Sequence, residues 1–108
     1  MKVQAITLAA LLCSVALGSA AVNAADAEKG KAKFALCASC HGGDGNTATM
    51  PGYPKIGGQD EKYLKNALTA YREGRRQGTY ASIMAETAKT LSDADIEDLA
   101  AYVSSLHH

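Results

Sequence analysis

Apolar residues recur at helical spacing in two stretches of the C-terminal half. In the first stretch, from Asp60 to Glu73, the apolar positions are Tyr63, Leu64, Ala67, Leu68 and Tyr71. Gly74 follows as a helix stop signal. The second stretch opens at Ser92 with a capping-box-like pattern, and its apolar stripe is Ile96, Leu99, Ala100, Val103 and Leu106. The pattern predicts one helix over 60–73 and a terminal helix that follows Ser92.

A further helix is predicted near the start of the chain. Asp26 can cap it, and it is expected to run into the segment Cys37-Ala38-Ser39-Cys40-His41. Gly30 and Phe34 are four residues apart and share one face. A glycine inside a helix costs up to about 1 kcal/mol relative to alanine, so Gly30 indicates the close approach of another helix. The alternative is a glycine that is merely tolerated there.

The remaining segments carry turn signals. Residues 42–58 hold six of the ten glycines and both prolines, which predicts a long loop. We expect this loop to wrap a functional site; the alternative is a floppy surface insertion. Residues 78–83 read as irregular, and 84–89 as a short helical turn. No alternation long enough for a β-strand and no internal repeat is present, so the predicted class is all-α.

The first 24 residues resemble a secretory leader. Met1 and Lys2 give a positive start, residues 3–17 are largely apolar, and Val22-Asn23-Ala24 fits a signal-peptidase site. The apolar run is shorter than the roughly 20 residues of a membrane span. Leu12 and the few residues upstream argue against lipidation of Cys13. We expect cleavage after Ala24, with Ala20 and Ala21 as alternatives, and a domain over 25–108.

The composition limits the possible functions of this domain. Without Lys2 it carries ten basic and eleven acidic side chains, a formal charge of −1. Nucleic-acid binders concentrate positive charge, so the composition gives no support to that class. The domain has no tryptophan, one phenylalanine and five tyrosines. Small domains with so thin a core commonly depend on an additional stabilising group.

The segment from Cys37 to His41 has the CxxCH spacing of c-type haem attachment. Each thiol can form a thioether with one haem vinyl group, and His41 can then bind the iron as proximal ligand. A flat apolar macrocycle would also complete the thin core. Among the nearby charges, Arg72, Arg75 and Arg76 form a cluster that reads as a solvated face. The alternative is that one of them meets a haem propionate or the carboxylates of a partner protein.

The second axial position has several candidates. Met84 lies between two predicted helices, whereas Met50 lies nine residues after His41 in the loop expected on the proximal side. This order favours Met84, although reach alone does not exclude Met50. His107 and His108 follow the last apolar residue and are expected to be solvated, or are not native.

Three other readings compete with a six-coordinate haem. An enzyme or sensor haem would leave the sixth position open. A dithiol oxidoreductase using Cys37 and Cys40 would be expected near a βαβ pattern, which the sequence lacks. A structural zinc site needs a fourth well-spaced ligand, which is missing beside His41.

The order of motifs is that of a known family. They are Phe34-x-x-Cys37-x-x-Cys40-His41-Gly42, Gly45-Asn46, Pro54-Lys55-Ile56-Gly57-Gly58-Gln59, Tyr63-Leu64, Met84, and Leu91-Ser92-Asp93-x-Asp95-Ile96-x-x-Leu99-Ala100-x-Tyr102. This order resembles the class I cytochromes c over residues 26–106. It is most similar to small periplasmic monohaem forms and to single halves of two-haem relatives. The sequence holds one CxxCH and so provides for one haem c.

The resemblance implies a fold and a set of site residues. The fold is a small cytochrome c, with three main helices and a short helical turn around one covalently bound haem. Met84 takes the position of the distal ligand, and Pro54 that of the proline whose carbonyl accepts the Nδ1 proton of His41. Pro51 is near enough to be an alternative, and Ile56 is expected to contact the haem. Gly30 and Phe34 should pack against Leu99 and Tyr102 of the last helix.

The expected function is electron transport rather than catalysis. The haem would cycle between ferric and ferrous iron in the periplasm, and the partners would be transient redox donors and acceptors. We expect no nucleic-acid partner, no membrane span after leader cleavage, and a monomer or weak oligomer. The alternatives are a haem subunit of a periplasmic dehydrogenase and a ligand-binding sensor.

Overall fold

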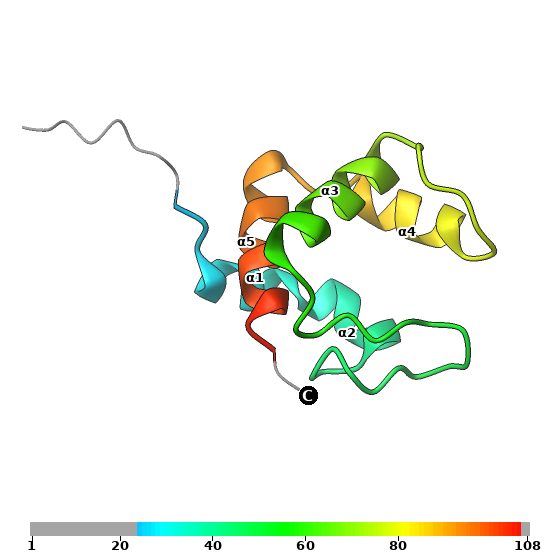
Figure 1. The fold of residues 1–108 in the computed structure, drawn as a ribbon, viewed down its shortest axis with the longest axis horizontal. Coiled ribbons are helices and arrows are strands. Elements are labelled where there is room, and N and C mark those ends of the chain that lie inside the picture. Colours follow the sequence, from blue (N-terminus) through cyan, green and yellow to red (C-terminus); the bar gives the residue numbers. More distant parts are fainter. Residues whose placement is uncertain (1–23, 107–108) are drawn as a thin grey trace, which may run out of the picture.

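The computed structural model describes residues 24–106, and within this range every regular element is a helix. Figure 1 shows the arrangement of its helices, which are α1 (Ala27–Lys33), α2 (Ala35–His41), α3 (Glu61–Arg72), α4 (Ala81–Ala88) and α5 (Asp93–Ser104). The all-α prediction is confirmed. None of these helices has the length and apolar character needed to cross a bilayer. Residues 1–23 of the predicted leader, including Cys13, lie outside the described range, as do His107 and His108.

Helix α1 packs closely against α5. A Cβ atom on Gly30 would come within 2.0 Å of the backbone oxygen of Asp98, so only glycine allows this approach. Beside it, the rings of Phe34 and Tyr102 have their centroids 5.4 Å apart. The Asp26 side chain caps α1, and its backbone N–H donates to Asp98 Oδ1 at 2.7 Å. The predicted contact between the first and last helices is confirmed.

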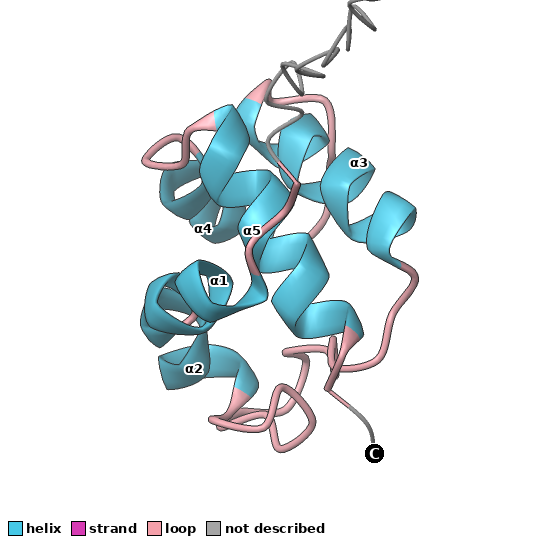
Figure 2. Cartoon of the chain, turned by 90° about the vertical axis from the view of Figure 1, so that its left-hand side faces the viewer, coloured by secondary structure: helices cyan, strands magenta, loops and turns pink. Residues whose placement is uncertain are grey.

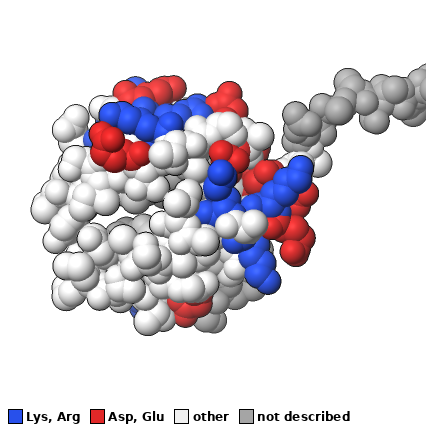
Figure 3. Space-filling model, turned by 180° about the vertical axis from the view of Figure 1, so that it is seen from behind, with Lys and Arg blue, Asp and Glu red and all other residues white. Residues whose placement is uncertain are grey.

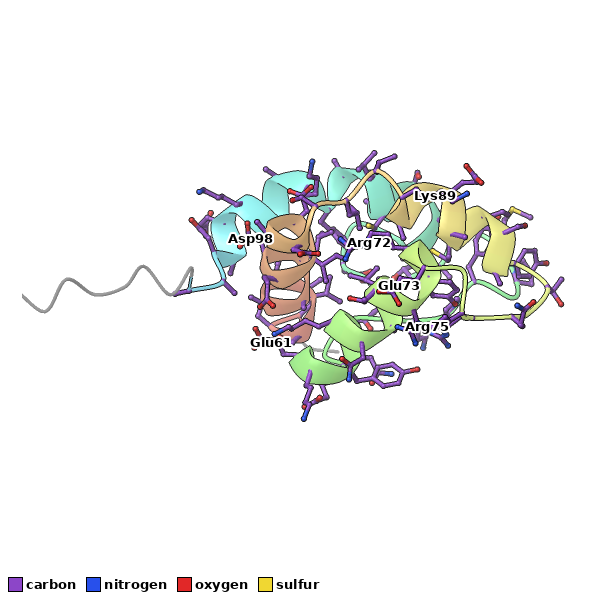
Figure 4. The ribbon with its side chains drawn as sticks, turned by 90° about the horizontal axis from the view of Figure 1, so that it is seen from above. Glu61, Arg72, Glu73, Arg75, Lys89 and Asp98 are labelled. Atoms are coloured by element: carbon purple, nitrogen blue, oxygen red, sulfur yellow. The ribbon has the colours of Figure 1, made fainter. Side chains whose placement is uncertain are left out.

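Helix α3 packs against both α5 and α4, and Figure 2 shows α5 at the centre of the domain. The largest group of buried apolar side chains joins all of them, and it consists of Phe34, Leu64, Ala88, Leu91, Ile96, Leu99, Ala100 and Val103. Arg72 ties the end of α3 to the start of α5, because its guanidinium donates to Leu91 O at 3.2 Å and to Asp93 Oδ1 at 2.6 Å (Figure 4). These contacts leave one side of the core open toward α2 and α4.

The capping box predicted for α5 is present, and Asp60 caps α3 as well. Asp60 Oδ2 accepts a hydrogen bond from the Tyr63 backbone N–H at 2.9 Å. Ser92 and Asp95 form a reciprocal capping box, with both hydrogen bonds at 3.0 Å. Each cap satisfies backbone N–H groups that the helix itself leaves without a partner. The starts of both helices are therefore determined locally.

Two expectations for the helices need correction. The helix predicted from Asp26 into the CxxCH segment is interrupted at Phe34, so that α1 and α2 are separate elements. The backbone there stays right-handed, with φ −62° and ψ −17°, and the interruption lies where Phe34 turns its ring onto α5. The short turn expected to begin at Met84 is a helix that begins at Ala81. Its N-cap, Tyr80, makes no side-chain capping bond, which removes the usual start signal.

The predicted loop over residues 42–58 is held by backbone hydrogen bonds. The carbonyl of Gly45 accepts from the N–H groups of Ile56 and Gly57, at 2.8 and 3.0 Å. At the end of the loop, the N–H of Gly58 donates to Val103 O in α5 at 2.9 Å. The loop is thus anchored both to itself and to the last helix, which is inconsistent with a floppy insertion.

Candidate functional site

Helix α2 brings the three reactive side chains of the CxxCH segment onto one side. Cys37, Cys40 and His41 stand at positions i, i+3 and i+4, which are neighbours on a helix surface. Gly42 ends the helix with φ +84°, and a Cβ atom there would lie 2.2 Å from the carbonyl oxygen of Thr47. The residue that follows His41 must therefore be glycine for the chain to turn directly into the loop.

The His41 ring is buried and held by a backbone carbonyl. Only 6% of the residue is exposed, and its Nδ1 lies 2.8 Å from Pro54 O. A carbonyl oxygen can only accept, so this contact requires the proton on Nδ1. The Nε2 lone pair is then available to a metal. The carbonyl of Pro54, rather than that of Pro51, makes the contact.

A cavity of about 370 Å³ opens beside this histidine. Its volume is in the range of small-molecule and cofactor sites. The walls come from α2, the 53–59 segment, α3, α4 and α5. Its most apolar lining residues are Ile56, Leu64, Ala67, Leu68, Ile83, Leu99, Ala100 and Val103. Cys37, Cys40, His41 and Met84 also line it. The structure therefore brings the CxxCH side chains together with Met84, which is 43 positions from His41 in the printed sequence.

The two methionines of the described range lie in different surroundings. Met84 lines the cavity and is partly buried. Met50 does not line it and is 52% exposed. The geometry thus favours Met84 over Met50 as the candidate axial ligand, a choice that sequence spacing alone left open.

The cavity lining carries two charged side chains, Lys55 and Arg76, and both are cationic. The guanidinium carbon of Arg76 lies 4.5 Å from the centroid of the Tyr71 ring. The other two arginines of the predicted cluster point elsewhere. Arg72 binds Leu91 and Asp93, and Arg75 pairs with Glu73 at 2.6 Å (Figure 4). The solvated-face reading is therefore wrong for Arg72 and Arg76, and it describes Arg75 alone.

Burial also changes the acidity of one thiol. Loss of hydration raises the pKa of Cys37 to about 11, and the nearby Cys40 adds to this effect. Cys37 is therefore a neutral thiol at neutral pH. Dithiol oxidoreductases depend on a thiol whose pKa is lowered instead. Within residues 24–106, no group of three or more His, Cys, Asp or Glu side chains is placed to hold a metal ion.

Sequence reasoning missed the tyrosines of this site. Tyr53 and Tyr80 line the cavity, and their ring centroids are 5.2 Å apart in an edge-on contact. Tyr80 is the N-cap of α4, four residues before Met84, and both residues line the cavity. Tyr53 directly precedes Pro54. The positions were visible in the sequence, but their pairing depends on how the loop folds back.

The residues around the cavity fit haem c. The macrocycle is apolar and flat and carries two anionic propionates, and the lining is mainly apolar with two cations. The thiols of Cys37 and Cys40 form no disulfide and are available for the thioether bonds. An imidazole and a thioether sulfur are available for the iron. Such a donor set matches haem ligation.

The comparisons with known proteins agree with this chemistry. The family model described as "Cytochrome c" matches residues 27–107. Cytochrome c-554(548) of Halomonas halodenitrificans is 46% identical over 82 residues, covering 76% of this chain and 98% of that protein. Cytochrome c4 of Stutzerimonas stutzeri is 39% identical over 104 residues, covering 91% of this chain and 49% of that protein.

A solved structure gives the same result for the fold. The crystal structure of reduced recombinant cytochrome c4 from Pseudomonas stutzeri superposes with a TM-score of 0.68 at 36% identity, covering 75% of this chain and 48% of that one. The chain thus spans nearly all of one relative and about half of the cytochromes c4. It belongs to the cytochrome c family, whose covalently attached haem c it carries for electron transfer.

Proposed function

We propose that this chain is a periplasmic electron carrier with one six-coordinate haem. Cys37 and Cys40 would hold the haem through thioether bonds, and His41 and Met84 would be its axial ligands. The observation that carries the proposal is the convergence of these four side chains, from α2 and α4, on one apolar cavity. When bound, the haem supplies a one-electron couple between ferric and ferrous iron.

The residues around His41 prepare it to bind iron. By donating its Nδ1 proton to Pro54 O, the imidazole keeps one tautomer and one ring orientation. The same hydrogen bond makes Nε2 more basic and hence a stronger ligand. The thioethers at Cys37 and Cys40 would lie four residues and one residue from His41, which limits how far the ring can move.

Met84 and the cavity wall would favour the reduced state. A thioether sulfur is a soft ligand that stabilises ferrous iron and raises the reduction potential. An apolar wall disfavours the additional positive charge of ferric iron and acts in the same direction. Because both ligands stay in place in either state, little of the chain would reorganise on electron transfer. No residue is required for acid–base catalysis.

The proposal includes export and transient partners. The leader over residues 1–24 would be removed after Ala24, which leaves the domain 25–108 in the periplasm. Donors and acceptors would meet the exposed haem edge over a small contact area, as in weak redox encounters. The second candidate, a haem subunit of a dehydrogenase, uses the same site and differs in having a permanent partner.

Carbon monoxide tests the six-coordinate proposal. The gas needs a vacant position on ferrous iron, so the reduced protein should keep its spectrum when exposed to it. The Met84→Ala variant should bind the gas rapidly, and Met50→Ala should behave as the unaltered protein. Rapid and complete binding by the unaltered protein would overturn the proposal in favour of a sensor or an enzyme with an open site.

A further inference from the structure

A pair of tyrosines joins the loop that holds His41 to the helix that carries Met84. Tyr53 directly precedes Pro54, whose carbonyl oxygen lies 2.8 Å from His41 Nδ1. Tyr80 is the N-cap of α4, and its carbonyl accepts a hydrogen bond from the Met84 backbone N–H at 3.3 Å. The ring centroids of Tyr53 and Tyr80 are 5.2 Å apart. One aromatic contact therefore connects the surroundings of both candidate axial ligands.

The Tyr80 ring also lies against the backbone of the loop at Gly52. A Cβ atom on Gly52 would come within 2.9 Å of Tyr80 Cε2, so the ring occupies space that any other side chain would need. The backbone there has φ +93°, a left-handed conformation that also favours glycine. In Figure 3 a hollow opens on the side of the molecule that α4 and this loop form. Tyr80 thus reaches across from α4 and rests on both Gly52 and Tyr53.

The first turn of α4 has few other ties to the rest of the domain. Residues 77–80 and 82–83 are exposed, and the buried residue of α4 is Ala88, at its far end. Within the described part of the chain, the hydrogen bonds of residues 77–84 all join positions no more than four apart. Helix α3 packs against α4. The contact of Tyr80 with Tyr53 and Gly52 is what joins this turn to the loop.

We propose that the contact between Tyr53 and Tyr80 keeps Met84 in place as the axial ligand. Because Met84 follows Tyr80 by one helical turn, the sulfur is held in the cavity while the Tyr80 ring stays on the loop. The contact therefore lowers the fraction of molecules in which the sixth position of the iron is open. Both tyrosines act through Met84 and are positioning residues. The inference deepens the proposed six-coordinate haem and rests on it.

Imidazole binding to the ferric protein measures how often the sixth position is open. Imidazole competes with Met84, so its apparent affinity is its affinity for the open site multiplied by the open fraction. Tyr80→Leu should tighten binding about fivefold, the order of the extra stabilisation that an aromatic pair provides. Tyr53→Leu should act similarly, and the double variant should bind no more tightly than the stronger single variant. Tyr80→Phe should behave as the unaltered protein, because the rings make the contact.

Two further variants separate the positioning of Met84 from other effects. In Met84→Ala the sixth position is already open, so adding Tyr80→Leu should leave the imidazole affinity unchanged. Tyr102→Leu is the matched control, because it removes an aromatic pair with Phe34, of similar separation at 5.4 Å, away from the cavity lining. This variant should lower the free energy of unfolding and leave the imidazole affinity unchanged.

An unchanged imidazole affinity in either Tyr80→Leu or Tyr53→Leu would overturn the inference. So would equal tightening in Tyr102→Leu, which would reflect global stability, or the same tightening by Tyr80→Leu in the Met84→Ala background. If the unaltered protein binds imidazole as tightly as Met84→Ala, Met84 is not a ligand and the proposed function itself fails. If these two proteins differ and the tyrosine variants do not follow the prediction, only the positioning role is wrong.

Discussion

The Nδ1 atom of His41 lies 2.8 Å from the carbonyl oxygen of Pro54, thirteen residues farther along the chain. This contact links the end of α2 to the returning half of the 42–58 loop. The acceptor is a backbone oxygen, so the position of the hydrogen bond depends on the path of the loop rather than on a side-chain rotamer. The loop is in turn held by the hydrogen bonds of Gly45 O with Ile56 N and Gly57 N. The orientation of the imidazole thus depends on the fold of the whole loop.

The proton on His41 Nδ1 should exchange slowly with water. It is donated to Pro54 O, and only 6% of the residue is exposed. A ¹⁵N-resolved NMR spectrum of the reduced protein should therefore show a ring N–H that persists after transfer to D₂O. Loss of this signal within the dead time, or a proton on Nε2 instead, would contradict the assignment of the ring.

Gly30→Ala should destabilise the protein although alanine favours helices. The new Cβ would lie 2.0 Å from the backbone oxygen of Asp98, so α1 and α5 would have to separate. Overpacking of this kind costs about 1–3 kcal/mol, more than the gain of up to about 1 kcal/mol in helix propensity. Denaturant unfolding followed through the haem absorbance measures the difference. Gly43→Ala is the control, because a Cβ atom there meets nothing within 4 Å.

The capping box of α5 should contribute to stability in a pH-dependent way. The Ser92 backbone N–H donates to Asp95 and holds the pKa of this carboxyl below its ordinary value of 3.8. A lowered pKa stabilises the fold above the unfolded value, and the contribution is lost as the pH falls through the lower folded value. Ser92→Ala should cost about 1 kcal/mol at neutral pH. In Asp95→Asn, the free energy of unfolding should fall less between pH 5 and pH 2 than in the unaltered protein. Identical pH profiles would contradict this role for Asp95.

Arg76→Gln should lower the midpoint potential. Arg76 is one of two cations that line the cavity, and a positive charge beside the haem disfavours the ferric state. Its removal should therefore favour oxidation, and Arg76→Lys should recover part of the loss. Arg75→Gln is the control, because Arg75 pairs with Glu73 outside the cavity lining. An equal shift in both glutamine variants, measured by spectroelectrochemistry, would show that position in the cavity is unimportant.

The sequence predicted the parts of this fold that local signals determine. Asp26 and Ser92 were predicted as caps, and α1 and α5 begin directly after them. The apolar periodicity placed the start of α3 at Asp60, and this residue is its N-cap. The packing of Gly30 and Phe34 against the last helix could be inferred because a glycine within a helix lowers helix stability, and close approach of another helix explains why it is there. The start of α4 could not be predicted in this way, because its N-cap, Tyr80, makes no capping bond.

The site was predictable only where covalent chemistry fixes the spacing of residues. Cys37, Cys40 and His41 are adjacent in sequence, so their grouping needs no knowledge of the fold. Arg76 and Tyr53 reach the cavity because a turn and a loop bring them there, and no periodicity records such a path. Met84 could be predicted only in part. Its position between two helices favoured it as a ligand, but only the structure shows that Met84 lines the cavity and that Met50 does not.

The most direct test of ligation by Met84 is the methyl signal of the methionine that would bind the iron. In the reduced protein labelled with [¹³C-methyl]methionine, the haem ring current should shift one methyl resonance strongly upfield if the sulfur of that methionine binds the iron. Ligation by Met84 predicts that this resonance disappears in Met84→Leu and remains in Met50→Leu. A shifted resonance that survives in Met84→Leu, or the absence of any shifted methyl in the unaltered protein, would contradict it.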